Sequence, residues 1–65
     1  MTRNEKIREI LENAKINDRK VTLLGDNFHL NCKVWYVYRG MDKVNICVDD
    51  VISTCIPFDL ITSVI

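Results

Sequence analysis

The side chains with the clearest chemical potential in this chain lie on one alternating segment, residues 28–39. Side chains of a β-strand switch faces at every residue, so the even positions of this segment would form an apolar face and the odd positions a polar one. An indole ring stacks on a nucleic-acid base, and lysine and arginine hold phosphate. The odd positions are therefore a candidate ligand-binding face, with Asn45 as a further contact from the next strand. They are Lys33, Trp35 and Arg39, together with His29, Asn31 and Val37.

A packing role is the alternative interpretation of the same segment. A long strand in a small barrel is bent, so that both faces are partly covered, and Trp35 and Val37 then pack beneath a helix. Tyr36 and Tyr38 fall on the even, core-facing positions, and their amphipathic rings also suit a subunit interface. The pattern leaves both roles open.

Catalysis and metal binding lack their usual residues. The chain has a single histidine, no serine near it in the sequence and no glycine-rich phosphate loop, so nucleophilic and phosphoryl-transfer chemistry are not expected. The adjacent residues Asp49 and Asp50 are typical of a turn. We expect no enzyme, no cofactor and no metal site, and we expect the cysteines to be free thiols packed as small apolar side chains. These cysteines are Cys32, Cys47 and Cys55.

Composition indicates a small domain that needs a partner. The 65 residues are near the lower limit for a chain that folds alone, yet 48% of them are hydrophobic. This apolar excess favours a partner surface, and a final strand edge at Val64 and Ile65 predicts that the partner is a second copy. Nine basic and nine acidic residues cancel, so no overall field attracts nucleic acid or a membrane. No apolar run reaches the length of a membrane span, which predicts a cytoplasmic protein.

The first part of the chain predicts one amphipathic helix, within residues 1–17. Thr2 and Glu5 have the spacing of a capping box, in which the threonine hydroxyl and the glutamate each hold a free backbone amide. Glu12 and Lys15 have the spacing of a helical ion pair. The apolar stripe of the helix consists of Ile7, Ile10, Leu11 and Ala14.

The rest of the chain, residues 20–65, predicts strands, so that residues 1–65 form a single domain. Tight turns at residues 25–27, 40–42 and 49–50 separate the first four strands. Pro57 begins a helical turn that precedes the last strand. The expected strands are residues 21–24, 28–39, 43–49, 51–56 and 61–65.

This order of elements resembles that of small SH3-like and Sm-like barrels. Residues 44–48, after Asp42, are similar to the end of the first Sm motif, in which an aspartate precedes a hydrophobic–asparagine–hydrophobic strand, and the helix before residues 21–25 is similar to the opening of bacterial Hfq-like proteins. The resemblance implies an α+β, mostly β fold: a helix followed by a five-stranded, strongly bent antiparallel barrel. It also implies rings in which the fourth strand of one copy pairs with the fifth strand of the next. The Arg-Gly or Lys-His signature of the second Sm motif, which helps to hold RNA in the family, is absent, and residues 56–59 take its place.

Two classes of function follow. We favour a non-enzymatic, oligomeric protein-binding module, of the kind that phages and other mobile elements use as inhibitors or adaptors that cover a partner's surface. The alternative is an Sm-like oligomer that binds RNA or a small nucleotide through Lys33, Trp35, Arg39 and Asn45. The neutral charge, the apolar excess and the missing second motif favour the first class.

Overall fold

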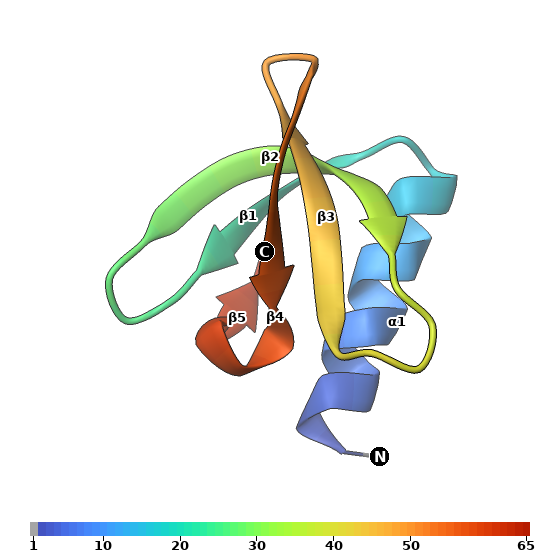
Figure 1. Cartoon of the computed structure of the whole chain (residues 1–65), viewed down its shortest axis with the longest axis vertical. Helices are drawn as coiled ribbons and strands as arrows, with labels where there is room; N and C mark the ends of the chain where they lie inside the picture. Colours follow the sequence, from blue (N-terminus) through green and yellow to red (C-terminus); the bar gives the residue numbers. More distant parts are fainter. Residues whose placement is uncertain (1) are drawn as a thin grey trace.

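The computed structural model describes residues 2–65 as one helix followed by a five-stranded antiparallel sheet (Figure 1). The α+β, mostly β class is therefore confirmed. In chain order the elements are α1 (Arg3–Ile16), β1 (Lys20–Leu24), β2 (His29–Val37), β3 (Lys43–Val48), β4 (Val51–Pro57), the 3₁₀ turn η1 (Phe58–Leu60) and β5 (Ser63–Val64).

The helix begins where the sequence predicts. The hydroxyl of Thr2 accepts a hydrogen bond from the backbone N–H of Glu5 at 3.2 Å, so Thr2 is the N-cap. The carboxylate of Glu5 accepts from that same hydroxyl, at 3.1 Å, in place of the backbone amide expected of a full capping box. No helix within residues 2–65 is long and apolar enough to span a membrane.

The strands follow one another as hairpins, except for the last. Their order across the sheet is β4-β3-β2-β1-β5, because the chain crosses through η1 from β4 to pair β5 with β1. Figure 1 shows β2 as a curved strand that runs from the β1 side of the sheet to α1. Within residues 2–65 no ladder joins β4 to β5, so the sheet is open and has two edges.

The turn between β3 and β4 has the geometry of a tight hairpin. Asp49 and Asp50 both have positive φ, at 52° and 65°, as the two central residues of a type I′ turn require. Aspartate tolerates this conformation better than most residues do. The prediction that this pair forms a turn is confirmed.

One hydrophobic core joins the helix to the sheet. Helix α1 contacts β2, β5 and η1, and it buries Ile7, Leu11 and Ala14, whereas Ile10 is left on the margin of the core with 39% of its surface exposed. The other buried side chains come from the strands and from the segment around η1. They are Val21, Leu23, Cys32, Val34, Val37, Val44, Ile46, Ile56, Phe58 and Ile61.

Strand β2 departs from the predicted alternation at a β-bulge. Val34 pairs with Ile46 and Tyr36 pairs with Asn45, so Trp35 is one extra residue on β2. The bulge changes which positions face the core: Val34 and Val37 are buried, and Trp35 and Tyr36 are both exposed. The prediction that Tyr36 faces the core and Val37 faces outward is therefore wrong.

Substitution of Leu11 by alanine tests the joint core. Leu11 has no exposed surface, so we expect its truncation to lower the free energy of unfolding by about 2–5 kcal/mol, a large share of the stability of so small a domain. Ile16→Ala is the matched control, because Ile16 lies on the same helix with 82% of its surface exposed. Urea denaturation followed by circular dichroism compares the two. Equal losses for both variants would contradict the packing of α1 on the sheet.

Candidate functional site

Lys33 lies away from the other members of the predicted basic face. Its Nζ is 3.4 Å from Oδ1 of Asp18, in the turn between α1 and β1. The side chain borders a hollow of about 340 Å³ in which Lys20 and Lys33 are balanced by Asp49 and Asp50. Equal numbers of the two charges give this hollow no preference for an anion.

Trp35 is set on the outside of the sheet by the bulge. Its side chain is 53% exposed, so the interpretation that it packs beneath the helix is wrong. The same interpretation is confirmed for Val37, which is 6% exposed and lies beside α1. The indole is therefore available for contact with another molecule.

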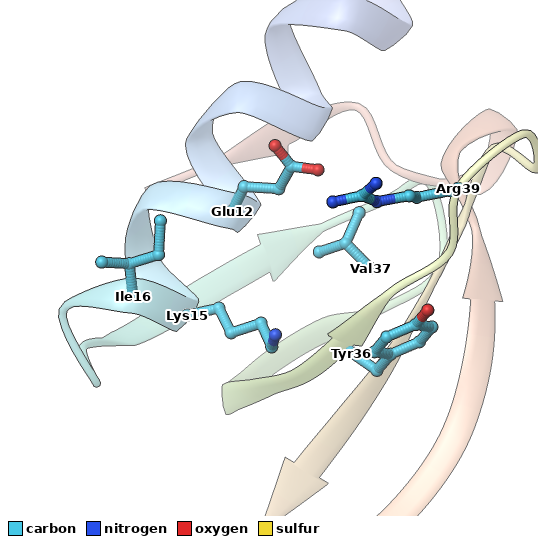
Figure 2. Close-up of a pocket in the computed structure, with 6 residues that line it drawn as sticks. All are labelled: Glu12, Lys15, Ile16, Tyr36, Val37 and Arg39. Atoms are coloured by element: carbon cyan, nitrogen blue, oxygen red, sulfur yellow. The ribbon is translucent and has the colours of Figure 1, made fainter.

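Arg39 lies just beyond β2 and faces the last turns of α1. It borders a groove that we call the helix–strand groove, with a volume of about 560 Å³. Figure 2 shows the Arg39 side chain directed toward the helix and the Lys15 side chain directed toward Tyr36. The lining residues are Glu12, Lys15 and Ile16 from α1, and Tyr36, Val37 and Arg39 from β2 and the residues after it.

Asn45 occupies the centre of β3 with an unusual polar environment. It pairs in register with Tyr36 on one side and with Cys55 on the other, and its side chain is half-buried. Its Oδ1 atom is buried without a hydrogen-bond donor in residues 2–65. A buried unpaired acceptor costs about 1–3 kcal/mol, so this amide lowers the stability of the fold.

Asp42, the aspartate of the motif-like segment, has a structural role. Its carboxylate accepts hydrogen bonds from Asn4 and Arg8, each at 3.0 Å, and its backbone carbonyl accepts from Phe58 N–H at 2.8 Å. Arg8 also donates to the backbone carbonyls of Tyr38 and Met41. These bonds tie α1 to the turn between β2 and β3.

The three cysteines are free, as expected. Burial raises the pKa of the Cys32 thiol, and the nearby Cys47 raises it further, so Cys32 remains a protonated, unreactive thiol at neutral pH. Within residues 2–65 no three His, Cys, Asp or Glu side chains are grouped closely enough to hold a metal ion.

The residues predicted as an interface are divided between two regions. Tyr36 and Tyr38 meet edge to face, with ring centroids 5.0 Å apart, next to the helix–strand groove. Val64 is half-buried in β5, and Ile65 is 70% exposed beside it.

Three groove residues on α1 were missed by sequence reasoning. Glu12 and Lys15 were expected to pair with each other, yet no ion pair joins them, and the Lys15 ammonium lies 5.7 Å from the centre of the Tyr36 ring. Ile16 was not expected to border a site. An apolar residue at the end of the helix, beside a lysine and outside the Leu11 stripe, is the one sequence signal that could have indicated this surface.

The chain was compared with protein-family models, with curated proteins and with solved structures, and no match was found in any of the three. The two candidate surfaces, the sheet edges and the helix–strand groove, are therefore inferred from the residues of this chain alone.

Substitution of Trp35 by alanine tests its exposed position. We expect a loss of about 1 kcal/mol or less, and so a fall in melting temperature of no more than about 8 °C. Phe58→Ala is the matched control, since Phe58 is an aromatic residue with no exposed surface and its truncation should cost about 3–5 kcal/mol. A Trp35 variant as unstable as the Phe58 variant would show that the indole is packed in solution.

Substitution of Asn45 by valine tests the unpaired amide. Valine removes the buried acceptor and favours a strand, so the free energy of unfolding should stay the same or rise by about 1 kcal/mol. Asn31→Val is the control, because the Oδ1 of Asn31 is satisfied by the Thr22 hydroxyl at 2.6 Å, and its loss should be neutral or unfavourable. Destabilisation by more than about 1 kcal/mol at Asn45 would mean that its amide is hydrogen-bonded in solution.

Proposed function

We propose that this chain is a small, non-enzymatic protein-binding module that associates with copies of itself through the two edges of its sheet. The observation that carries the proposal is the apolar character of those edges. On β4, Val51 is 66% exposed and Ile52 is 52% exposed, and Ile65 beside β5 is 70% exposed. Open strand edges with apolar side chains are templates for pairing with another chain.

The two edges are suited to pair with each other. In β4, the residues Val51–Thr54 are all exposed, and the backbone next to β5 is extended, since Thr62 and Ile65 also bond to β1. Pairing of β4 in one copy with β5 in the next is a head-to-tail contact, which builds a closed ring if the rotation between copies allows it. A stable interface of about 800 Å² per partner would cover roughly a fifth of the 4474 Å² surface of one chain.

The order of elements supports an Sm-like or SH3-like module. The sheet order β4-β3-β2-β1-β5, the helix before β1 and the 3₁₀ turn between β4 and β5 agree with the resemblance in the sequence. In such folds the strongly curved second strand belongs to both halves of a bent sheet. The absent second Sm motif separates this chain from the RNA-binding members. Of the residues that replace it, Ile56 and Phe58 are buried in the core, and the neighbouring Leu60, 57% exposed, adds to the apolar surface available for protein contacts.

A nucleic-acid function is the second candidate, and the exposure of Trp35 favours it. The indole could stack on a base. The phosphate-binding side chains proposed with it lie apart, because Lys33 is beside Asp18 and Arg39 faces α1. For this reason we place protein contact first.

Light scattering after size exclusion tests the edge proposal. The wild-type chain should have a mass that is a multiple of 7.6 kDa, and a lysine at either edge, Ile52→Lys or Ile65→Lys, should reduce that mass. Ile16→Lys is the control, because Ile16, 82% exposed, is more exposed than either edge residue but lies on α1. A wild-type monomer at all concentrations would contradict the proposal.

Mixing the two edge variants tests the head-to-tail arrangement. In that arrangement Ile52→Lys keeps an intact β5 edge and Ile65→Lys keeps an intact β4 edge, so an equimolar mixture should form heterodimers that neither variant forms alone. A contact of β4 with β4 predicts that Ile52→Lys alone disrupts assembly, and that the mixture forms no new species.

A further inference from the structure

The helix–strand groove has the features of a small-molecule site, independent of the sheet edges. Its volume of about 560 Å³ lies in the range of ligand pockets, about 300–1,000 Å³. The buried side chain of Val37 forms an apolar floor, and Ile16 and Tyr36 stand on either side of it (Figure 2).

The cationic side chains of the groove are not engaged in the ion pairs that the structure describes. Within residues 2–65 the ion pairs are those of Arg8 with Asp42 and of Lys33 with Asp18, so neither Lys15 nor Arg39 has a carboxylate within 4.0 Å. Lys15, Arg39 and Glu12 together give the lining one net positive charge. A lining with a net positive charge attracts an anion.

The aromatic wall is held in place from two sides. The Tyr36 ring meets the Tyr38 ring edge to face at 5.0 Å, and the Lys15 ammonium lies 5.7 Å from the centre of the Tyr36 ring. The bulge at Trp35 leaves this ring 45% exposed. An ordered, exposed aromatic ring beside an apolar floor is suited to contact with a second ring.

We propose that the helix–strand groove binds a small molecule with an aromatic body and a single carboxylate. The ring packs on Val37 beside Tyr36, and the carboxylate pairs with the guanidinium of Arg39, with Lys15 adding a second positive charge to the lining. Arginine pairs with carboxylates through two parallel N–H···O bonds. Glu12 offsets part of this attraction, since its carboxylate repels the negative charge of the ligand.

The test is an NMR titration of the ¹⁵N-labelled chain with phenylacetate. We expect a saturable shift of the backbone amides of residues 15–16 and 36–39, with a Kd of about 1 mM, as is usual for a ligand of this size. Two further probes separate the contributions: benzyl alcohol has the ring without the charge, and acetate has the charge without the ring. Each should bind more weakly than phenylacetate.

Variants of exposed groove residues assign the contacts. Arg39→Gln removes a charged donor and should weaken phenylacetate about tenfold, and Tyr36→Leu should weaken phenylacetate but not acetate. Lys33→Gln is the matched control, because Lys33 borders the other hollow, and its effect should be about twofold at most. Glu12→Gln removes the negative charge of the lining and should strengthen the binding of phenylacetate.

Three results would overturn the proposal. One is the absence of a saturable shift at groove residues with phenylacetate at about 20 mM, well above the expected Kd. Another is equal weakening by Arg39→Gln and Lys33→Gln, which would indicate general attraction to positive charge. The third is binding of benzyl alcohol or acetate to the wild-type chain as tight as that of phenylacetate. The mass measured by light scattering tests the edge contacts separately, so the two proposals can fail independently.

Discussion

The packing of α1 on the curved sheet is the interaction on which the remaining structure depends. So short a chain has few residues to bury, and the helix supplies Leu11 and Ala14, both without exposed surface, to a core that would otherwise be open on that side. Arg8 holds the helix against the sheet. Its guanidinium bonds to backbone carbonyls just beyond β2 and to Asp42, and it lies 5.3 Å from the centre of the buried Phe58 ring. A charged side chain thus ties α1 to the residues that follow β2, next to the helix–strand groove.

The bulge in β2 is the second constraint, and it decides which side chains reach solvent. A regular strand would have placed Tyr36 in the core and Val37 outside. With Trp35 as the extra residue, Val37 joins the core, and two aromatic side chains become exposed one after the other. Bulges bend a strand and increase its twist, and the curvature of β2 brings its end to α1 (Figure 1). Both the aromatic wall of the groove and its apolar floor therefore result from one inserted residue.

Most of the fold could be predicted from sequence because its signals are local. The cap at Thr2, the stripe that contains Leu11, the turn at residues 49–50 and the interruption at Pro57 each act within a few residues, and the elements appear where these signals place them. The bulge could not be predicted, because it is a property of the pairing of β2 with β3 and both faces of residues 34–37 are apolar or aromatic. The candidate site was predicted only in part, with Arg39 and Tyr36 found and the helix residues missed, because groove formation depends on the tertiary position of α1. Lys33 and Arg39 were predicted to lie on one face of a single strand. They lie apart because the bulge comes between them and because β2 ends at Val37, before Arg39.

The two proposed surfaces are compatible with one another because they use different parts of the sheet. The edges are formed by β4 and β5, whereas the groove lies between α1 and the end of β2, where β2 is paired with β3. Edge pairing therefore leaves the groove open, and each copy in an assembly would carry one groove. If the chain assembles through its edges, several grooves would be held together, and linked sites bind a partner that carries several aromatic carboxylate groups more tightly than one groove would. In this arrangement self-association through apolar edges would strengthen recognition without any new contact at the groove itself.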